Sequence, residues 1–564
     1  MGKPNVNLGN NKWATKSGGI LGYEDNINKN VSPVEFDFSR ASSGTTINRQ
    51  GLIELVDEGA EGIINGDFSD GSNGWSFSNI GGSNGWRISD GRAICDSSAA
   101  TANRNLVSDS SLVNGNSYKL IIDILQSVDN MSIYVGGTLL SQTLPTGTNL
   151  NYECFISASE HSGGALTLYA SSSDLQEISN ISVKEVLEEY PRIDFSDDVN
   201  GALLLEPQST NLIKYSEGFS NSYWVKSGSN VVQGFASPDG ALNAYKLVEG
   251  SNNGNHRLEV SGLTVVSSKY NVSIYVKSYG RDEVRVTLAN YFNSATDVYF
   301  NLKTKSVILG SEAEDGLIEV LSDGWFRCSF TSKSNAIAGG NAKLYIDTAL
   351  GGSNTYQGNG ASGVYIYGAQ LEALPYATSY IPNYGNASGV TRVADTCNNG
   401  GQVGNFNSIE GVLYADMAAL SNYGGLRLIQ LSDGTDDNRV SLYFDVSANT
   451  IYCNVVVSSS SNALSFPLSD ATIYNKLAIA WKTDRIEFWI NGIKGAEDLV
   501  FTTFAASTLN NLDFSLNGSY DFQGKIKDLR VYRTALTDDE LVLLTRPSYS
   551  SYESMSNSLE YKVI

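Results

Sequence analysis

Aromatic side chains stand near arginines or carboxylates in three separate parts of this 564-residue sequence. An aromatic ring can stack on the C–H face of a sugar, while arginine, carboxylate or amide groups can bind sugar hydroxyls. Each single aromatic residue could equally belong to a hydrophobic core or to a contact between subunits. The sequence therefore predicts carbohydrate binding through a set of candidates: Trp86, Arg87, Tyr134, Tyr279, Arg281, Tyr291, Tyr423, Asp436 and Arg439.

Catalysis by common side-chain constellations is not favoured. Histidine occurs only at His161 and His256, which leaves little material for a Ser-His-Asp triad or a histidine-rich metal site. A glycosidase needs two carboxylates around the scissile bond, and the 60 Asp and Glu residues offer many chance pairs. No segment has the pattern of a β-helix or barrel. A non-catalytic protein is therefore predicted, with a polysaccharide depolymerase as an alternative.

Charge and cysteine usage exclude other classes. The formal net charge of −22 repels phosphate backbones and anionic membranes, so neither nucleic acid nor a membrane is an expected partner. No run of residues is apolar enough to span a bilayer, and the N-terminus lacks the apolar core of an export signal. The five cysteines are scattered without a Cys-x-x-Cys pair, which predicts buried free thiols rather than disulfides or a zinc site.

Two stretches of the chain begin alike and predict a duplicated module. Residues 66–69 read Gly-Asp-Phe-Ser and precede Trp75, whereas residues 217–220 read Glu-Gly-Phe-Ser and precede Trp224. Each start leads into short alternating strands joined by Gly- and Asn-rich turns. The 55 glycines and 31 tyrosines, against 4 methionines, favour an all-β fold of tandem β-sandwiches. Trp75, Trp224 and Trp481 are predicted core residues.

The repeat and the turn-rich stretches divide the chain into a series of segments. Residues 59–186 interrupt a hairpin pattern that resumes at 187, which predicts that they are an insertion. The expected order is an N-terminal arm (1–31), a split hairpin unit (32–58 and 187–208), an inserted jelly roll (59–186), a second jelly roll (209–375), a linker (376–405), a last sandwich (406–546) and a tail (547–564).

Residues 476–494 and 524–541 resemble the laminin-G or concanavalin-like lectin fold. They combine a strand ending in Trp481, an alternating strand with an Asn-Gly turn, and a final strand leading into a short helix. This resemblance covers residues 406–546. The two Phe…Trp blocks resemble carbohydrate-binding modules of the galactose-binding jelly-roll type.

The jelly-roll resemblance also implies a structural calcium ion where the first and last strands meet, held by hard oxygen ligands. Asp67 with Asn180, and Glu217 with Gln370, stand at the matching places in the sequence. The closing residue is an amide in both copies, where the family more often has Asp. The alternative for both places is a hydrogen-bonded strand junction.

Residues 7–23, 40–54 and 203–219, together with the ending 551–564, resemble virion proteins of tailed bacteriophages, especially phages of Bacteroidota. The resemblance implies a tail or head fibre or adhesin, made in the host cytoplasm, released by lysis and bound to host surface polysaccharide and other virion proteins. A homotrimer is expected by analogy with fibres. The competing interpretation is a structural decoration protein of the capsid or tail that binds no sugar.

Overall fold

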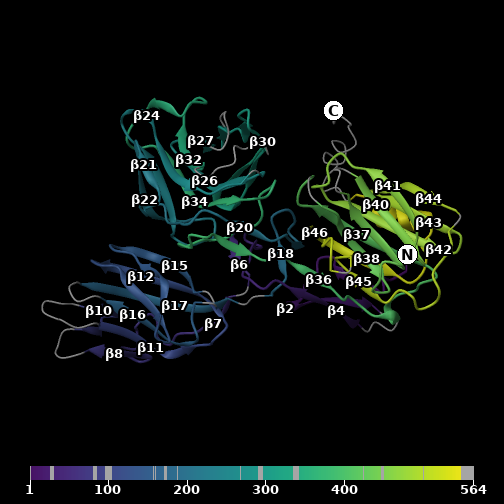
Figure 1. Cartoon of the computed structure of the whole chain (residues 1–564), viewed down its shortest axis with the longest axis horizontal. Coiled ribbons are helices and arrows are strands. Elements are labelled where there is room, and N and C mark those ends of the chain that lie inside the picture. Colours follow the sequence, from purple (N-terminus) through teal and green to yellow (C-terminus); the bar gives the residue numbers. More distant parts are fainter. Residues whose placement is uncertain are drawn as a thin grey trace. The chain divides into compact units, whose positions relative to one another are not determined.

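The computed structural model describes residues 2–25, 31–56, 58–79, 85–95, 104–156, 158, 160–170, 175–186, 189–266, 268–289, 296–333, 342–422, 425–445, 450–499, 501–516 and 518–547. The chain is all-β and consists of tandem β-sandwiches, as the sequence predicts (Figure 1). In the described part, α1 (Asp538–Thr545) is the one α-helix, and no helix has the length and apolar character needed to cross a membrane. All five cysteines are free and buried, which confirms their predicted state.

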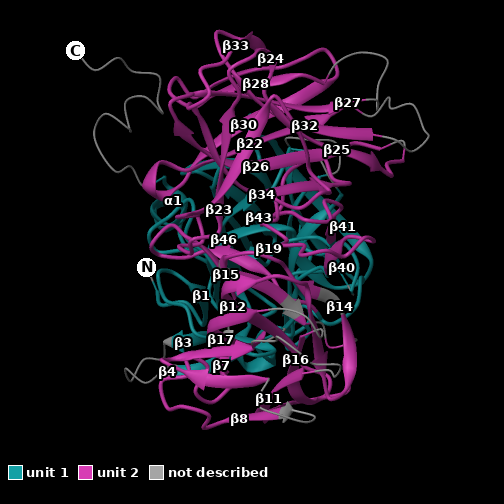
Figure 2. Cartoon of the chain, turned by 90° about the vertical axis from the view of Figure 1, so that its left-hand side faces the viewer, with its two compact units in different colours: residues 1–41, 189–208, 393–564 teal, residues 42–188, 209–392 magenta. Residues whose placement is uncertain are grey.

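The chain divides into two compact units (Figure 2). Unit 1 contains residues 1–41, 189–208 and 393–564, and unit 2 contains residues 42–188 and 209–392. Unit 1 is a sandwich of two sheets around one apolar core. The larger sheet follows the order β36 (Thr396–Asn398), β4 (Val31–Ser39), β3 (Gly19–Asp25), β1 (Val6–Gly9), β46 (Gly524–Tyr532), β37 (Gly411–Ala419), β42 (Asn475–Lys482), β43 (Arg485–Ile490) and β44 (Ile493–Asp498); the smaller follows β41 (Ser460–Pro467), β40 (Thr450–Val457), β39 (Arg439–Phe444), β38 (Arg427–Ser432) and β45 (Asn511–Asp513).

N-terminal residues that the sequence predicts to form an extended arm are strands of the larger sheet. β1 pairs with β46, with Leu8 opposite Leu529, and Leu8 is fully buried. β19 (Ala202–Leu205) pairs with β46 farther along, with Leu203 opposite Ile526. These two strands supply hydrogen-bond partners along one edge of β46, and their apolar side chains join the core of unit 1.

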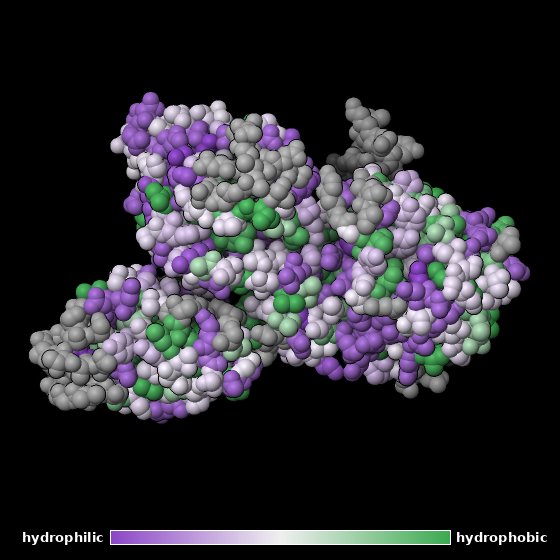
Figure 3. All heavy atoms as spheres, viewed as in Figure 1, coloured by the Kyte–Doolittle hydropathy of each residue, from purple (hydrophilic) through white to green (hydrophobic). Residues whose placement is uncertain are grey.

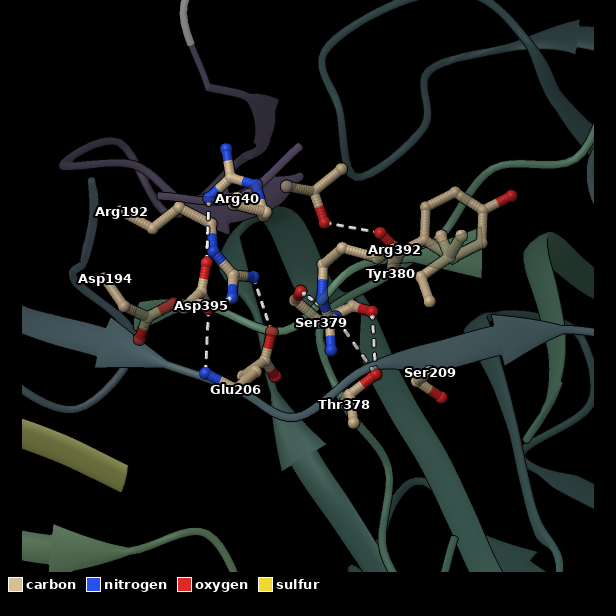
Figure 4. Close-up of polar contacts among 12 residues, drawn as sticks. Arg40, Arg192, Asp194, Glu206, Ser209, Thr378, Ser379, Tyr380, Arg392 and Asp395 are labelled. Atoms are coloured by element: carbon tan, nitrogen blue, oxygen red, sulfur yellow. Dashed lines mark hydrogen bonds and ion pairs between the residues drawn. The ribbon is translucent and has the colours of Figure 1, made fainter. Parts of the chain in front are cut away.

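Four buried charges lie near the places where the chain leaves and re-enters unit 1 (Figure 4). Arg40 Nη1 lies 3.1 Å from Asp395 Oδ1, and Arg192 Nη1 lies 2.5 Å from Glu206 Oε2. Arg192 also pairs with Asp395. Burial of these charges is tolerable because each meets an opposite charge in hydrogen-bonding geometry.

At each of the two places where the chain leaves unit 1, a backbone hydrogen bond joins the leaving segment to the returning segment. Glu189 N–H donates to Arg40 O at 3.2 Å, and Asp395 N–H donates to Glu206 O at 2.9 Å. The two ends of residues 42–188 therefore lie close together, and so do the two ends of residues 209–392. Unit 1 is continuous in space although its sequence is interrupted twice.

Unit 2 contains two jelly rolls that share the order of five strands in each sheet, and the second adds one edge strand to each sheet; this supports the predicted duplication. The first has one sheet ordered β15 (Asn149–Ile156), β12 (Ser117–Ser127), β17 (Gln176–Val186), β10 (Arg92–Cys95), β9 (Trp86–Ser89) and another ordered β14 (Thr138–Leu144), β13 (Met131–Val135), β16 (Gly164–Ala170), β11 (Arg104–Leu112), β8 (Trp75–Asn79). β7 (Glu58–Glu61) also pairs with β17. The second has one sheet ordered β30 (Ala313–Val320), β31 (Phe326–Ser332), β26 (Asn271–Tyr279), β34 (Gly363–Glu372), β23 (Ala244–Glu249), β22 (Ser229–Phe235) and another ordered β29 (Ser306–Ile308), β28 (Val298–Asn301), β27 (Glu283–Ala289), β32 (Ala342–Ala349), β25 (Arg257–Leu263), β21 (Val225–Ser227).

The Phe…Trp motif has the same geometry in both copies. The rings of Phe68 and Trp75 lie 5.3 Å apart at 48°, and those of Phe219 and Trp224 lie 5.0 Å apart at 48°. All four side chains are buried in the two cores. The predicted core role of both tryptophans is confirmed, and Trp481 is likewise buried in unit 1.

The segment 32–58, predicted to belong to one hairpin unit, contributes to both units. β4 lies in the sheet of unit 1, whereas β5 (Thr45–Ile47) and β6 (Ile53–Leu55) form a separate hairpin in unit 2. Ile53 of that hairpin packs in an apolar cluster with Tyr275 and Tyr380. This hairpin therefore covers part of the outward face of the second jelly roll, and Pro375 and Thr378 accept hydrogen bonds from Thr331 and Arg327 on another part of the same sheet.

Candidate functional site

Three neighbouring strands of the second jelly roll present a row of polar and aromatic side chains on the outward face of their sheet. Lys246 on β23 lies opposite Tyr365 on β34, and Tyr365 lies opposite Lys277 on β26. The residues next in sequence, such as Leu247 and Ile366, point into the core, because side chains alternate along a strand. The row is therefore set by strand register, and Tyr365 is 119 residues from Lys246 and 88 from Lys277 in the sequence.

Two further rings extend this row. The ring of Tyr279 lies 5.3 Å from that of Tyr365, and the ring of Phe235, on the edge strand β22, lies 5.0 Å from that of Tyr365. The ammonium of Lys246 lies 4.1 Å from the centre of the Tyr279 ring and 5.1 Å from that of Phe235, as cation–π contacts require. We call this set the aromatic patch: Phe235, Lys246, Lys277, Tyr279 and Tyr365.

The aromatic patch is open to solvent at one end of the sheet face. The next outward row contains Tyr275 and Tyr367, which are buried beneath Ile53 of the β5–β6 hairpin and beneath Tyr380. By contrast, Tyr279 keeps 37% of its surface exposed. On the side of the molecule drawn in Figure 3, apolar residues are interspersed with polar ones.

The patch combines the two kinds of group that hold sugars. Aromatic rings offer flat apolar faces, and the lysines offer hydrogen-bond donors beside them. Lys277 Nζ lies 2.8 Å from Asp323 Oδ2, and that carboxylate keeps 72% of its side-chain surface exposed. Such a pair contributes little stability and leaves both groups able to bind a ligand.

The outward face of the other sheet has a different character. Arg257 stacks 4.1 Å from the centre of the Tyr345 ring, and Arg285 Nη2 lies 2.9 Å from the buried Asp347. Lys343 Nζ lies 2.6 Å from Glu259 Oε1. Burial alone would raise the pKa of Glu259, but its hydrogen bonds have the larger effect and lower that pKa. Arg285 lowers the pKa of Asp347, but the opposite effect of burial is larger, and this pKa is raised. This face is an internally paired network, which indicates a structural role.

The structure does not gather the predicted sugar-binding residues into one site. Tyr279 lies in the aromatic patch, but Arg281 donates to Glu249 at 2.6 and 2.8 Å. Trp86 is 2% exposed because its alternating strand turns it into the core, so the predicted surface role is wrong for this residue. Of the remaining predicted residues, Arg87 is exposed on β9, Tyr134 packs against Tyr169 on the first jelly roll, Arg439 donates to the backbone of the exposed Asp436 in unit 1, and Tyr291 and Tyr423 lie outside the described residues.

Sequence reasoning missed Phe235, Lys246, Lys277 and Tyr365. The alternation of Val364, Tyr365 and Ile366 indicates that Tyr365 faces outward, but only strand pairing brings it beside Lys246 and Lys277.

The residues predicted to hold calcium do not occupy equivalent places. Ile181 N–H donates to Gly66 O, and Ala369 N–H makes the equivalent bond to Ser216 O. Asn180 comes one residue before this equivalent position and Gln370 one residue after it. The Gln370 amide donates to Glu372 at 2.7 Å and accepts from Ile381 N–H at 2.7 Å, away from Glu217. Asp67 is exposed, and hydrogen bonds from the backbone and side chain of Ser69 lower its pKa.

Glu217 lies in a buried polar cluster instead. Its Oε1 accepts from Tyr380 Oη at 2.9 Å and from Tyr367 Oη at 3.1 Å, and Tyr367 Oη also contacts Asp239 Oδ2 at 2.9 Å. Burial, with nearby carboxylates, raises the pKa of Glu217 to about 8. No group of three or more His, Cys, Asp or Glu residues suited to a metal occurs in the described part of the chain, and the calcium site stays a prediction.

No protein-family model matches this chain, and no curated protein matches it. Solved structures similar to parts of it include carbohydrate-binding modules and laminin G domains. The CBM40 module of Ruminococcus gnavus IT-sialidase is 21% identical, with a TM-score of 0.22, over 25% of this chain and 84% of that one. The tandem CBM22-1–CBM22-2 domain of Paenibacillus barcinonensis Xyn10C is 11% identical, with a TM-score of 0.20, over 56% and 97%.

Domains LG4-5 of the mouse laminin alpha1 chain are 12% identical to this chain, with a TM-score of 0.19, over 58% of this chain and 96% of that one. Likenesses at these identities and TM-scores say nothing of what this chain binds. The function must therefore be argued from its own residues.

Proposed function

We propose that this protein binds glycans and that the aromatic patch of the second jelly roll is its principal binding surface. The observation that carries the proposal is the group of three neighbouring rings, Phe235, Tyr279 and Tyr365, with the Lys246 ammonium among them on an outward sheet face. A pyranose can stack on such rings while its hydroxyls accept hydrogen bonds from lysine. The surface is pre-formed, so little ordering is needed on binding.

A glycan array with the full chain, followed by calorimetry on the best ligand, tests the proposal. Tyr279→Ala should weaken binding at least tenfold because it removes the most exposed ring of the patch. Tyr520→Ala is a matched control, since it removes a tyrosine of unit 1 that is 52% exposed and should leave binding unchanged. Silence across host polysaccharides would overturn the proposal and favour a purely structural role. Release of reducing ends would instead support a depolymerase.

We further propose that the protein is displayed on a phage virion, as a tail or head fibre or adhesin. The support is the sequence resemblance of residues 7–23, 40–54 and 203–219 to virion proteins of tailed phages. A trimer would present several patches and raise the avidity of weak single sites. Light scattering of the purified chain tests the trimer, and antibody labelling of virions tests the location. A monomer in solution, or unlabelled virions, would contradict the respective part.

A further inference from the structure

We infer that the aromatic patch selects a carboxylate-bearing sugar, such as a uronic acid residue, over a neutral one. The inference rests on the proposed function and names the ligand class of the same surface. Its basis is the charge of the patch. Lys246 and Lys277 flank Tyr365 on adjacent strands, and Asp323 is the one carboxylate with a described ion pair to either lysine.

Lys246 differs from the cations on the opposite face of the same jelly roll. There, Arg257 and Lys343 pair with Glu259, and Arg285 pairs with Asp347. Lys246 forms no ion pair with any carboxylate among the described residues, and its ammonium lies over two rings instead. An ammonium held over rings is partly removed from water and gains strongly from a carboxylate placed beside it.

The overall charge of the chain does not oppose this selection. The net charge is −22, but exposed charges farther away than a Debye length of about 8 Å are largely screened at physiological ionic strength. Lys246, Lys277 and Asp323 are the charged groups that make described contacts within the patch. Two cations against one exposed carboxylate leave a local excess of positive charge.

The geometry fits a uronic acid because this sugar carries its carboxylate at the rim of a pyranose ring. The Lys246 ammonium covers one face of the Tyr279 ring, 4.1 Å from its centre, so a sugar packed against the edge of that ring would place its carboxylate beside the ammonium. One residue would then provide the apolar contact and its neighbour the charge contact. A neutral hexose could make only the first contact and ordinary hydrogen bonds.

Calorimetry of the full chain with oligogalacturonate, oligoglucuronate and oligomannuronate, each beside its carboxyl-reduced neutral counterpart, tests the inference. At least one acidic oligosaccharide should bind tenfold or more tightly than its neutral counterpart, and the difference should shrink at 0.5 M NaCl. Lys246→Gln should lower the affinity ratio of acidic to neutral oligosaccharide to about one, because glutamine keeps a hydrogen-bond donor for sugar hydroxyls but carries no charge. Lys343→Gln, a lysine of the internally paired face, should keep the preference.

The outcomes separate this inference from the function on which it rests. Equal binding of acidic and neutral oligosaccharides, with Tyr279→Ala still weakening both, would overturn the charge selection and leave the proposed function intact. A preference that persists in Lys246→Gln would overturn the role of that lysine. No binding to any glycan would overturn the proposed function and this inference together.

Discussion

The two jelly rolls of unit 2 share a backbone plan but differ in the chemistry of one equivalent row. In both, a backbone carbonyl near the start of the copy accepts a hydrogen bond from a backbone N–H of the last strand. The pairs are Gly66 with Ile181 in the first copy and Ser216 with Ala369 in the second. Glu177 precedes Ile181 by four residues, as Tyr365 precedes Ala369 by four, so these two residues occupy equivalent positions. The neighbours of Glu177 are Ile94 and Gln126, whereas those of Tyr365 are Lys246 and Lys277.

This difference teaches that the fold constrains only the inward half of each strand. The inward residues Ile178 and Ile366 are both apolar and buried, because they fill the same position in the core. The outward residues of this row, Glu177 and Tyr365, are partly exposed and can vary with little cost to the fold. In the first copy Glu177 pairs with Arg92 at 2.6 Å, and in the second Tyr365 contacts other rings. Binding capacity therefore belongs to a row of side chains and not to the jelly roll as such.

The prediction with the greatest expected effect asks whether the Phe–Trp packing contributes equally to the stability of the two cores. Phe68→Ala and Phe219→Ala each remove a buried ring packed on a tryptophan and should each destabilise their own copy by about 3–5 kcal/mol. Hydrogen-exchange mass spectrometry, read separately over the two copies, measures both. If only one of the two substitutions destabilised its copy, the ring packing would contribute unequally to the stability of the two copies in spite of its shared geometry.

The second prediction concerns the strand junctions, where Glu217 is buried and Asp67 is exposed. The folded pKa of Glu217, about 8, lies above the ordinary value of 4.5. The unfolded chain therefore releases this proton first, so stability from Glu217 is full below about pH 4.5 and is lost as the pH rises toward 8. Each pKa unit corresponds to about 1.4 kcal/mol.

Glu217→Gln should therefore flatten the pH dependence of the second copy and stabilise it at pH 8 by a few kcal/mol. The new carbonyl can still accept from Tyr367 and Tyr380. The new amide nitrogen replaces Glu217 Oε2, which accepts from Asn243 Nδ2 at 3.5 Å, so the Asn243 amide has to turn over and present its buried Oδ1 as the acceptor. Asp67→Asn is the matched control and should leave the pH profile of the first copy nearly unchanged. Melting curves between pH 5 and pH 9 decide this, and an unchanged slope in Glu217→Gln would contradict the buried-acid explanation. If calcium binds at this junction, adding the ion would raise the melting temperature of the parent chain.

The third prediction exchanges the two rows. Lys246→Ile with Tyr365→Glu gives the second copy the residues of the first, and glycan affinity should fall at least tenfold, or about 1.4 kcal/mol. The fold should persist, because the first copy carries the same residue types at these positions. The reciprocal pair, Ile94→Lys with Glu177→Tyr, tests whether the row alone confers binding on the first copy. Calorimetry measures both chains, and undiminished affinity in the first variant would place binding elsewhere.

The smallest expected effect concerns the surface pair beside the patch. Asp323→Asn removes the exposed carboxylate that contacts Lys277 and should change the free energy of unfolding by less than about 1 kcal/mol. Affinity for an acidic oligosaccharide should rise slightly, by up to about threefold, because the patch loses its one paired negative charge. A larger loss of stability would indicate that this pair holds the η1 turn (Ser322–Gly324) in place.

Sequence alone was enough to predict the all-β class, the duplicated Phe…Trp start, the strands within 476–494 and 524–532, and the buried state of the cysteines. These features are local: alternation, turn residues and a ring followed closely by a tryptophan are read from neighbouring positions. The tertiary structure decided what no local pattern contains. Long-range pairing placed the N-terminal strand beside β46, closed both departures from unit 1 around Arg192 and Asp395, turned Trp86 into a core, and brought Lys246, Tyr365 and Lys277 into one row. The physical reason is that hydrogen-bonded register between distant strands sets which side chains become neighbours, and one chain segment carries no information about its partner's register.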